Sequence, residues 1–249
     1  MTDSYRALCS DFYINQRLNL KMDLPRARET VLDMFDRVRR QFPAMDQFRR
    51  YKDELALESN ASGAAQQWVA IRTNNIRSGT VNPETLQEAY ALHLHLLEVA
   101  PYFLSISPLD VDYLELLYGF DLLAAGNHDQ IVYDALLAGT PLGAVLDIKN
   151  ASIVDCQPVF GVALPGDLDA EAHVEVKTRP SSRGPKDADA PAEPISVYLT
   201  LRTYGPLEEV SDLPGAFRGL CAHGENLLES KVVRHLIMPI RDVIATGQG

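Results

Sequence analysis

The segment from Val111 to Leu123 most strongly constrains what this chain can fold into. Between Val111 and Phe120 its sequence is Val-Asp-Tyr-Leu-Glu-Leu-Leu-Tyr-Gly-Phe, which puts apolar side chains on both faces of an extended chain. Such a pattern is typical of a central strand that is covered on both sides. We therefore expect this segment to lie inside a sheet and to carry much of the core.

The residues before this strand predict an α+β half over residues 1–125. Tyr13–Met22 alternates apolar and polar residues as a half-buried strand does, and the following apolar residues recur at helical spacing up to Phe42. Tyr51–Glu58 and a strand from Gln67 to about Arg77 form a predicted hairpin, and a second helix opens at Asn82. The order strand, helix, strand, strand, helix, strand indicates a ferredoxin-like half.

Residues 126–249 predict a second half, in which an antiparallel sheet packs on a long C-terminal helix. The expected elements are a helix over His128–Ala138, strands near Leu142–Ile148, Asp155–Leu164, Glu171–Thr178 and Ile195–Thr203, and a final helix over Pro214–Ile244. This order resembles the helix-grip arrangement, in which a curved sheet wraps the last helix and often leaves a cavity between them. Residues 179–194 contain four Pro and no large apolar group, so we expect a disordered hairpin tip there.

The charge of the chain is distributed unevenly. Its formal net charge of −11 argues against a nucleic-acid partner, because phosphate recognition needs concentrated positive charge. Residues 78–148 hold 10 acidic residues and no Lys or Arg, whereas a basic segment runs from Arg26 to Lys52. Its candidate interface residues are Arg37, Arg39, Arg40, Arg49 and Arg50. Both surfaces are either solvated faces or complementary patches that meet across a subunit interface.

The sequence lacks the usual markers of catalysis, export and membrane insertion. It contains no nucleotide-binding loop, hydrolase elbow, HExxH or kinase signature. Cys9, Cys156 and Cys221 are odd in number and widely spaced, which indicates neither a disulfide framework nor a structural zinc site. No apolar run approaches the ~18 residues of a membrane span, and the N-terminus lacks the features of a signal peptide. We expect a cytoplasmic protein without a cofactor and without a membrane partner.

A metal site at His128 has a simpler explanation. Asn127-His128-Asp129 follows the strand that bears Glu115 and Asp121, and carboxylates beside an imidazole suit a divalent ion. Asn127 is, however, a good helix cap, and Asp129 is favourable at a helix N-terminus. We therefore predict no metal.

Two polar clusters are candidate binding sites. His173, Glu175, Tyr198 and Arg202 fall on alternating positions of neighbouring strands, and together with Tyr118 they would converge if they lined a cavity. The same alternation equally describes the solvated side of an antiparallel sheet.

Arg72, Asn74 and Arg77 form the second cluster, which could hold an anion through bidentate bonds. Polar protection of a strand edge gives the same pattern without a ligand.

The expected function is that of a non-enzymatic module that self-associates or binds a protein, because chemical motifs are absent while charge asymmetry and apolar helices are strong. A homo-oligomer is the expected state. The alternative is a small-molecule-binding or cyclase/isomerase-like protein with a cavity between the C-terminal helix and its sheet.

Overall fold

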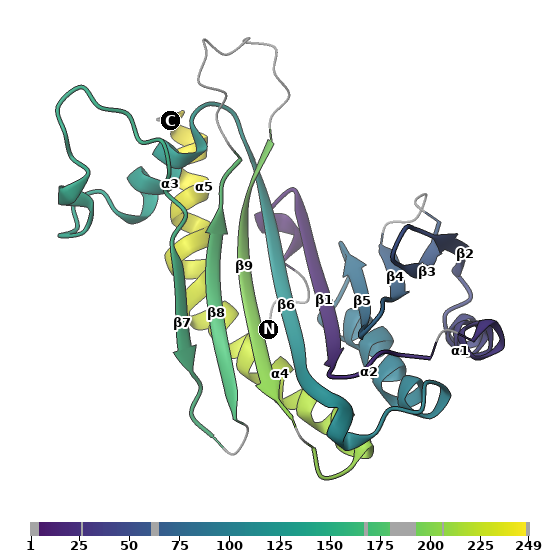
Figure 1. Cartoon of the computed structure of the whole chain (residues 1–249). Helices are drawn as coiled ribbons and strands as arrows, with labels where there is room; N and C mark the ends of the chain where they lie inside the picture. Colours follow the sequence, from purple (N-terminus) through teal and green to yellow (C-terminus); the bar gives the residue numbers. More distant parts are fainter. Residues whose placement is uncertain are drawn as a thin grey trace.

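The apolar segment at the middle of the sequence forms β6 (Val111–Ala124), a central strand of a computed structural model that describes residues 5–25, 27–60, 65–166, 169–179, 193–205 and 207–247. These residues form a mixed α+β fold around one antiparallel sheet (Figure 1). Its strand order is β2-β3-β4-β5-β1-β6-β9-β8-β7.

The helices and strands have the following bounds. The strands are β1 (Asp11–Leu20), β2 (Met45–Arg50), β3 (Leu55–Ser59), β4 (Gln66–Ile71), β5 (Asn75–Val81), β6, β7 (Val159–Ala163), β8 (Ala170–Lys177) and β9 (Glu193–Tyr204). The α-helices are α1 (Arg28–Gln41), α2 (Leu86–Phe103), α3 (His128–Leu136), α4 (Leu213–Leu227) and α5 (Met238–Thr246). Short 3-10 helices lie at Arg6–Leu8, Pro108–Asp110, Gly143–Val145 and Val210–Asp212.

The two predicted halves share this sheet. β6 pairs with β1 on one side and with β9 on the other, in unbroken register from Tyr113 opposite Tyr204 to Ala124 opposite Glu193. Every pairing in the sheet is antiparallel. The ferredoxin-like arrangement of residues 1–125 is not confirmed, because this part of the chain contributes six strands to the sheet, in the order β2-β3-β4-β5-β1-β6, and not the predicted four.

Helices cover only one face of the sheet. Figure 1 shows α2 and the long C-terminal helix behind the strands, and no described helix in front of them. Along β6, Leu114, Leu116 and Tyr118 are buried beneath the helices, whereas Tyr113 and Glu115 on the other face are half-buried. The expectation of a central strand covered on both sides is therefore wrong, since the second apolar face includes residues that remain partly exposed.

Three local predictions need correction. Met45–Arg50 is a strand that the sequence analysis did not predict, and the strand from Gln67 to Arg77 is two strands joined by a tight turn, in which the Arg72 N–H donates to the Asn75 carbonyl. Leu142–Ile148 is no strand; it contains a 3-10 turn and exposes its apolar side chains, because no neighbouring strand pairs with it. Of the predicted disordered tip, residues 180–192 lie outside the described residues.

The C-terminal helix packs closely against β6 and β9. It runs from α4 through a π-helical stretch, Leu228–Ile237, into α5. At Gly224 an added Cβ would lie 2.5 Å from Cε2 of Tyr118, so only glycine lets the helix approach this ring. The Tyr118 hydroxyl is hydrogen-bonded to that of Tyr90, at 2.6 Å.

Two glycines of α4 should therefore respond oppositely to the same substitution. Gly224→Ala should lower the free energy of unfolding by about 1–3 kcal/mol, because the new methyl group overlaps Tyr118. Gly215→Ala, where nothing lies within 4 Å of the added Cβ, should raise it by up to about 1 kcal/mol through helix propensity. Urea unfolding of both variants measures the difference, and equal effects would contradict the close approach of helix and sheet.

A hydrogen-bonded polar cluster lies within the core between α2 and the sheet. His93 is fully buried, its Nδ1 lies 2.7 Å from Oγ of Ser78, and Ser78 donates to Oε1 of Gln16 at 3.0 Å. Burial lowers the pKa of His93 from 6.5 to about 3, and a backbone hydrogen bond to Ile14 only partly opposes this effect. His93 is thus a neutral core histidine.

This histidine should make the fold sensitive to acid. Below pH 6.5 the unfolded chain binds a proton at His93 that the folded chain excludes until about pH 3, so stability is lost as pH falls through this window. The loss from this group is about 1.4 kcal/mol for each pH unit. Urea unfolding at several pH values should show a shallower pH dependence for His93→Gln than for the parent chain. Identical slopes would exclude this role.

Candidate functional site

The face of the sheet opposite the helices carries a continuous set of polar side chains, and we call it the open face. Side chains alternate between the two faces of a strand, so residues next to the buried Leu199 and Leu201 point to this side. It comprises Tyr13, Asn15, Arg17 and Asn19 of β1, Tyr113, Glu115 and Leu117 of β6, Tyr198, Thr200, Arg202 and Tyr204 of β9, and Glu171, His173 and Glu175 of β8. Four of the five predicted cavity residues lie here.

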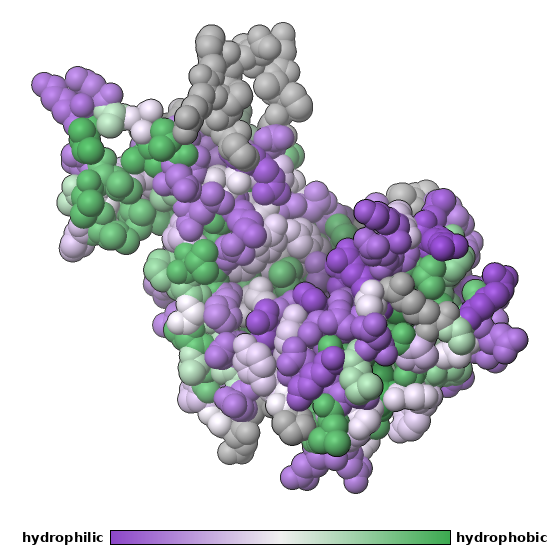
Figure 2. All heavy atoms as spheres, viewed as in Figure 1, coloured by the Kyte–Doolittle hydropathy of each residue, from purple (hydrophilic) through white to green (hydrophobic). Residues whose placement is uncertain are grey.

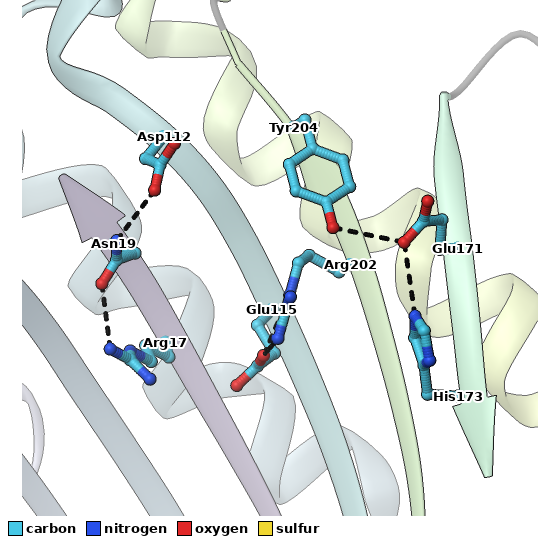
Figure 3. A network of polar contacts seen from close by, with 8 residues as sticks. All are labelled: Arg17, Asn19, Asp112, Glu115, Glu171, His173, Arg202 and Tyr204. Atoms are coloured by element: carbon cyan, nitrogen blue, oxygen red, sulfur yellow. Dashed lines mark hydrogen bonds and ion pairs between the residues drawn. The ribbon is translucent and has the colours of Figure 1, made fainter. Parts of the chain in front are cut away.

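The charged groups of β6, β9 and β8 pair with one another across the open face (Figure 3). Arg202 donates to Oε2 of Glu115 through Nε at 3.1 Å and also through Nη2, and its guanidinium lies 4.4 Å from the centre of the Tyr113 ring. On β8, Glu171 accepts hydrogen bonds from His173 at 3.3 Å and from the Tyr204 hydroxyl at 3.2 Å. These two bonds lower the pKa of Glu171. The charged side chains of this network therefore bind one another, and these bonds fix their positions on the open face.

The five predicted cavity residues do not converge. His173, Glu175, Tyr198 and Arg202 do lie together on the open face, where Glu175 pairs with Lys177 at 3.2 Å. Tyr118 faces the opposite way and is fully buried beneath α4, next to Gly224. The five side chains therefore cannot line one cavity between the C-terminal helix and the sheet.

Two of the three predicted anion-binding residues do come together. Arg72 and Arg77 both bind Oε2 of Glu54, at 2.7 Å from Nε of Arg72 and in a shorter contact from Arg77. Asn74 is turned toward the Leu20 carbonyl, to which its amide donates at 3.4 Å. The arginine pair thus holds a carboxylate, and this carboxylate is supplied by the chain itself.

The predicted interface arginines lie at the β2 end of the sheet. Arg37, Arg39 and Arg40 are exposed on α1, and Arg49 and Arg50 are exposed on the edge strand β2. Arg39 pairs with Asp36 of the same helix at 2.9 Å, with both side chains about half exposed. An exposed pair of this kind contributes little to stability. These charges keep this edge solvated.

The opposite edge of the sheet has a different character. All five residues of β7, Val-Phe-Gly-Val-Ala, are exposed, and the side chains of Phe160 and Val162 are each 57% exposed. No charged residue lies between Pro158 and Pro165. Edge strands are normally protected by charges, bulges or a covering element. Among the described residues, β7 has none of these.

Residues 137–157, which we call the apolar arm, project beside this edge. Figure 2 shows hydrophobic residues gathered on the part of the molecule that protrudes near α3. The exposed apolar side chains of the arm are Leu142, Val145, Leu146, Ile148 and Val154. The sequence predicts a strand over part of this segment, Leu142–Ile148. The turn residues Gly139-Thr140-Pro141 and Asn150-Ala151-Ser152 on either side were the available signal of an arm.

Polar residues of α3 fasten the arm to the sheet. Asp129 is buried, and its Oδ1 accepts from the Cys156 N–H at 3.0 Å and from the Thr178 hydroxyl at 2.7 Å. Asn127 caps α3 by accepting from the amides at positions 129 and 130, and its own amide donates to the Ile153 carbonyl at 2.8 Å. The predicted cap is confirmed, and the carboxylate next to it holds the chain that leads into β7.

No group of three or more His, Cys, Asp or Glu side chains among the described residues is placed to hold a metal ion. No helix in the described ranges is both long and apolar enough to cross a membrane. A comparison with protein families found no match, and a comparison with curated proteins found no significantly similar sequence.

Removing the Asp129 carboxylate should loosen the arm. Asp129→Ala leaves the Cys156 N–H and the Thr178 hydroxyl without their acceptor, and such a loss costs about 1–3 kcal/mol for each buried group. Asp129→Asn retains a side-chain oxygen and should be milder. Hydrogen–deuterium exchange should show faster exchange at residues 153–158 in the alanine variant. Unchanged protection of the Cys156 amide would contradict this anchoring role.

Proposed function

We propose that this chain is a non-enzymatic, self-associating binding protein, and that β7 pairs antiparallel with β7 of a second copy. The observation that carries this proposal is the uncharged, fully exposed edge strand beside the apolar arm. The mutual pairing of the charged groups on β6, β9 and β8 supports a binding role over acid–base chemistry. We include a reducing, cytoplasmic location in the proposal, which the free thiols of Cys9, Cys156 and Cys221 support.

The backbone of β7 offers free hydrogen-bonding groups on its outer side. The Val176 N–H donates to the Pro158 carbonyl at 3.0 Å, and the Leu164 N–H donates to the Ala170 carbonyl at 2.8 Å. Bonding alternates along an antiparallel strand, so the even-numbered residues face β8. The N–H and C=O groups of Val159, Gly161 and Ala163 therefore point outward, where a further strand would satisfy them.

The sequence of β7 suits pairing with itself. A two-fold axis through Gly161 sets Phe160 opposite Val162 of the second copy, and Val159 opposite Ala163. Each pair is apolar, and no like charges meet, although the chain carries a net charge of −11. A cyclic dimer needs such a self-complementary patch. The arms would then lie next to the interface and cover further apolar surface.

A second copy fits this edge better than an unrelated protein does, because the same short strand supplies both apolar sides of the contact. The exposed arginines of α1 and β2 lie at the far end of the sheet and take no part in it. Their contact with the acidic middle third remains a separate prediction.

Sedimentation velocity of the full chain tests the proposal directly. The parent chain should sediment as a dimer, and Phe160→Lys or Val162→Lys should weaken dimerisation at least about tenfold, because each new ammonium group would lie opposite an apolar side chain of the second copy and lose water without gaining a counter-ion. Both side chains are already exposed in the monomer, so the substitutions should leave the fold intact.

Met22→Lys is the matched control, since Met22 is 67% exposed and follows β1, away from β7. It should dimerise as the parent chain does. A monomeric parent chain at high micromolar concentration would overturn the proposal, and so would dimers that persist unchanged in both β7 variants.

A further inference from the structure

Arg17 is a half-buried cation on the open face that lacks a counter-ion. Its cross-strand neighbours are Arg77 on β5 and Glu115 on β6. Glu115 forms its ion pair with Arg202, as Figure 3 shows. Arg17 forms no ion pair with any residue in the described part of the chain. Two arginines thus face each other across neighbouring strands, which by itself is unfavourable.

The polar atoms around this arginine pair are incompletely bonded. Nη2 of Arg17 donates to Oδ1 of Asn19 at 3.0 Å, and Asn19 donates in turn to Asp112. The Nε groups of Arg17 and Arg77 are buried without a partner, as is Oδ1 of Asn75. Asn75 is only 5% exposed. Buried polar groups are normally satisfied, so these three atoms on β1 and β5 have hydrogen-bonding capacity that the described side chains do not use.

One internal carboxylate serves the neighbouring arginines. Glu54 binds both Arg72 and Arg77, so Arg72, Arg77 and Arg17 have a single ion-paired carboxylate among them. Burial lowers the pKa of Arg77, the ion pair with Glu54 opposes this effect, and the charges of Arg72 and Arg17 add to the lowering. The three guanidiniums thus outnumber the one carboxylate that is ion-paired with them, even though the whole chain is acidic.

A hollow with an aromatic wall adjoins these arginines. Its volume is about 570 Å³, and its lining includes Tyr51, Trp68, Arg72 and Arg77 together with the acidic Asp53, Glu54 and Glu58. Arg17 lies outside this lining, opposite Arg77 on the neighbouring strand. The Trp68 ring extends over β5 at Gly79, where an added Cβ would lie 2.3 Å from Cε2 of the indole. The Arg77 guanidinium lies 5.7 Å from the ring centre. A glycine in mid-strand thus makes room for an aromatic ring beside the arginine pair.

We propose that this cluster is a binding site for a small aromatic carboxylate. The ring of the ligand lies against Trp68, and its carboxylate accepts hydrogen bonds from Arg17 and Arg77. Aromatic rings pack favourably on an indole, and the guanidinium fork matches a planar carboxylate. The hollow has the volume of a small-molecule site. Glu54 already shows that arginines of this cluster bind a carboxylate. The site is independent of the β7 pairing, which lies at the far edge of the sheet.

Fluorine NMR titration of the full chain with 4-fluorobenzoate tests this site. Binding should be saturable and at least about tenfold tighter than that of 4-fluorobenzamide, which has the same ring without the charge. Trp68 is the single tryptophan of the chain, so its emission should change with the same dependence on concentration. Arg17→Gln should remove most of the preference for the carboxylate.

Arg39→Gln is the matched control, because Arg39 is an exposed arginine on α1 and lies outside the cluster. It should bind as the parent chain does. Thermal unfolding should confirm that Arg17→Gln remains folded, since this substitution relieves the repulsion with Arg77. The absence of saturable binding would overturn the proposal, as would equal binding of both probes or an unchanged preference in Arg17→Gln.

Discussion

The antiparallel pairing of β6 with β1 and β9 is the interaction on which the rest of the structure depends. The strand is paired along most of its length on both sides, so it joins segments from the two ends of the chain into one sheet. Its inward residues Leu114, Leu116 and Tyr118 then fix where the helices pack. Gly224 shows how closely the C-terminal helix follows, because any side chain at that position would displace the Tyr118 ring.

Covering one face of the sheet has consequences for the other face. Long strands with one buried face must place alternate side chains in or near solvent. Here those side chains form cross-strand pairs such as Arg202 with Glu115, and aromatic rings lie over glycines, as Trp68 does at Gly79 and Tyr13 does at Gly119. Arg17 departs from this pattern, because its nearest cross-strand carboxylate is already used. Because most charged side chains on the open face form ion pairs, the guanidinium of Arg17, which forms none among the described residues, marks a place where an anion could bind.

The two edges of the sheet differ in the charge of their exposed side chains. β2 exposes Asp46, Arg49 and Arg50, which keep that edge hydrated. β7 exposes only apolar side chains and free backbone groups, and its position is fixed through the hydrogen bonds of Asp129. The fold thus keeps one end of the sheet solvated and leaves the other with exposed apolar side chains.

Much of the local structure could be predicted from the sequence, because periodicity depends only on near neighbours. The period of two in β1, the helical stripe of α1, the cap at Asn127 and the extent of β6 all follow from such patterns. Apolar content did not predict burial where burial depends on partners far away in the sequence. Leu142–Ile148 resembles a core strand, yet no strand lies beside it, and Phe160 is exposed because β7 is the last strand of the sheet.

The sequence by itself determined which residues alternate and therefore which side chains share a face. Only the tertiary structure decided which face the helices cover, which strands form the edges, and that Arg17 lies opposite Arg77 while Glu115 pairs with Arg202. Strand order and register bring together residues far apart in the chain, and the free energy of that pairing is shared among many contacts. No local pattern records it, so Tyr118 and Tyr198, both chosen from the sequence as cavity residues, lie on opposite faces of the same sheet.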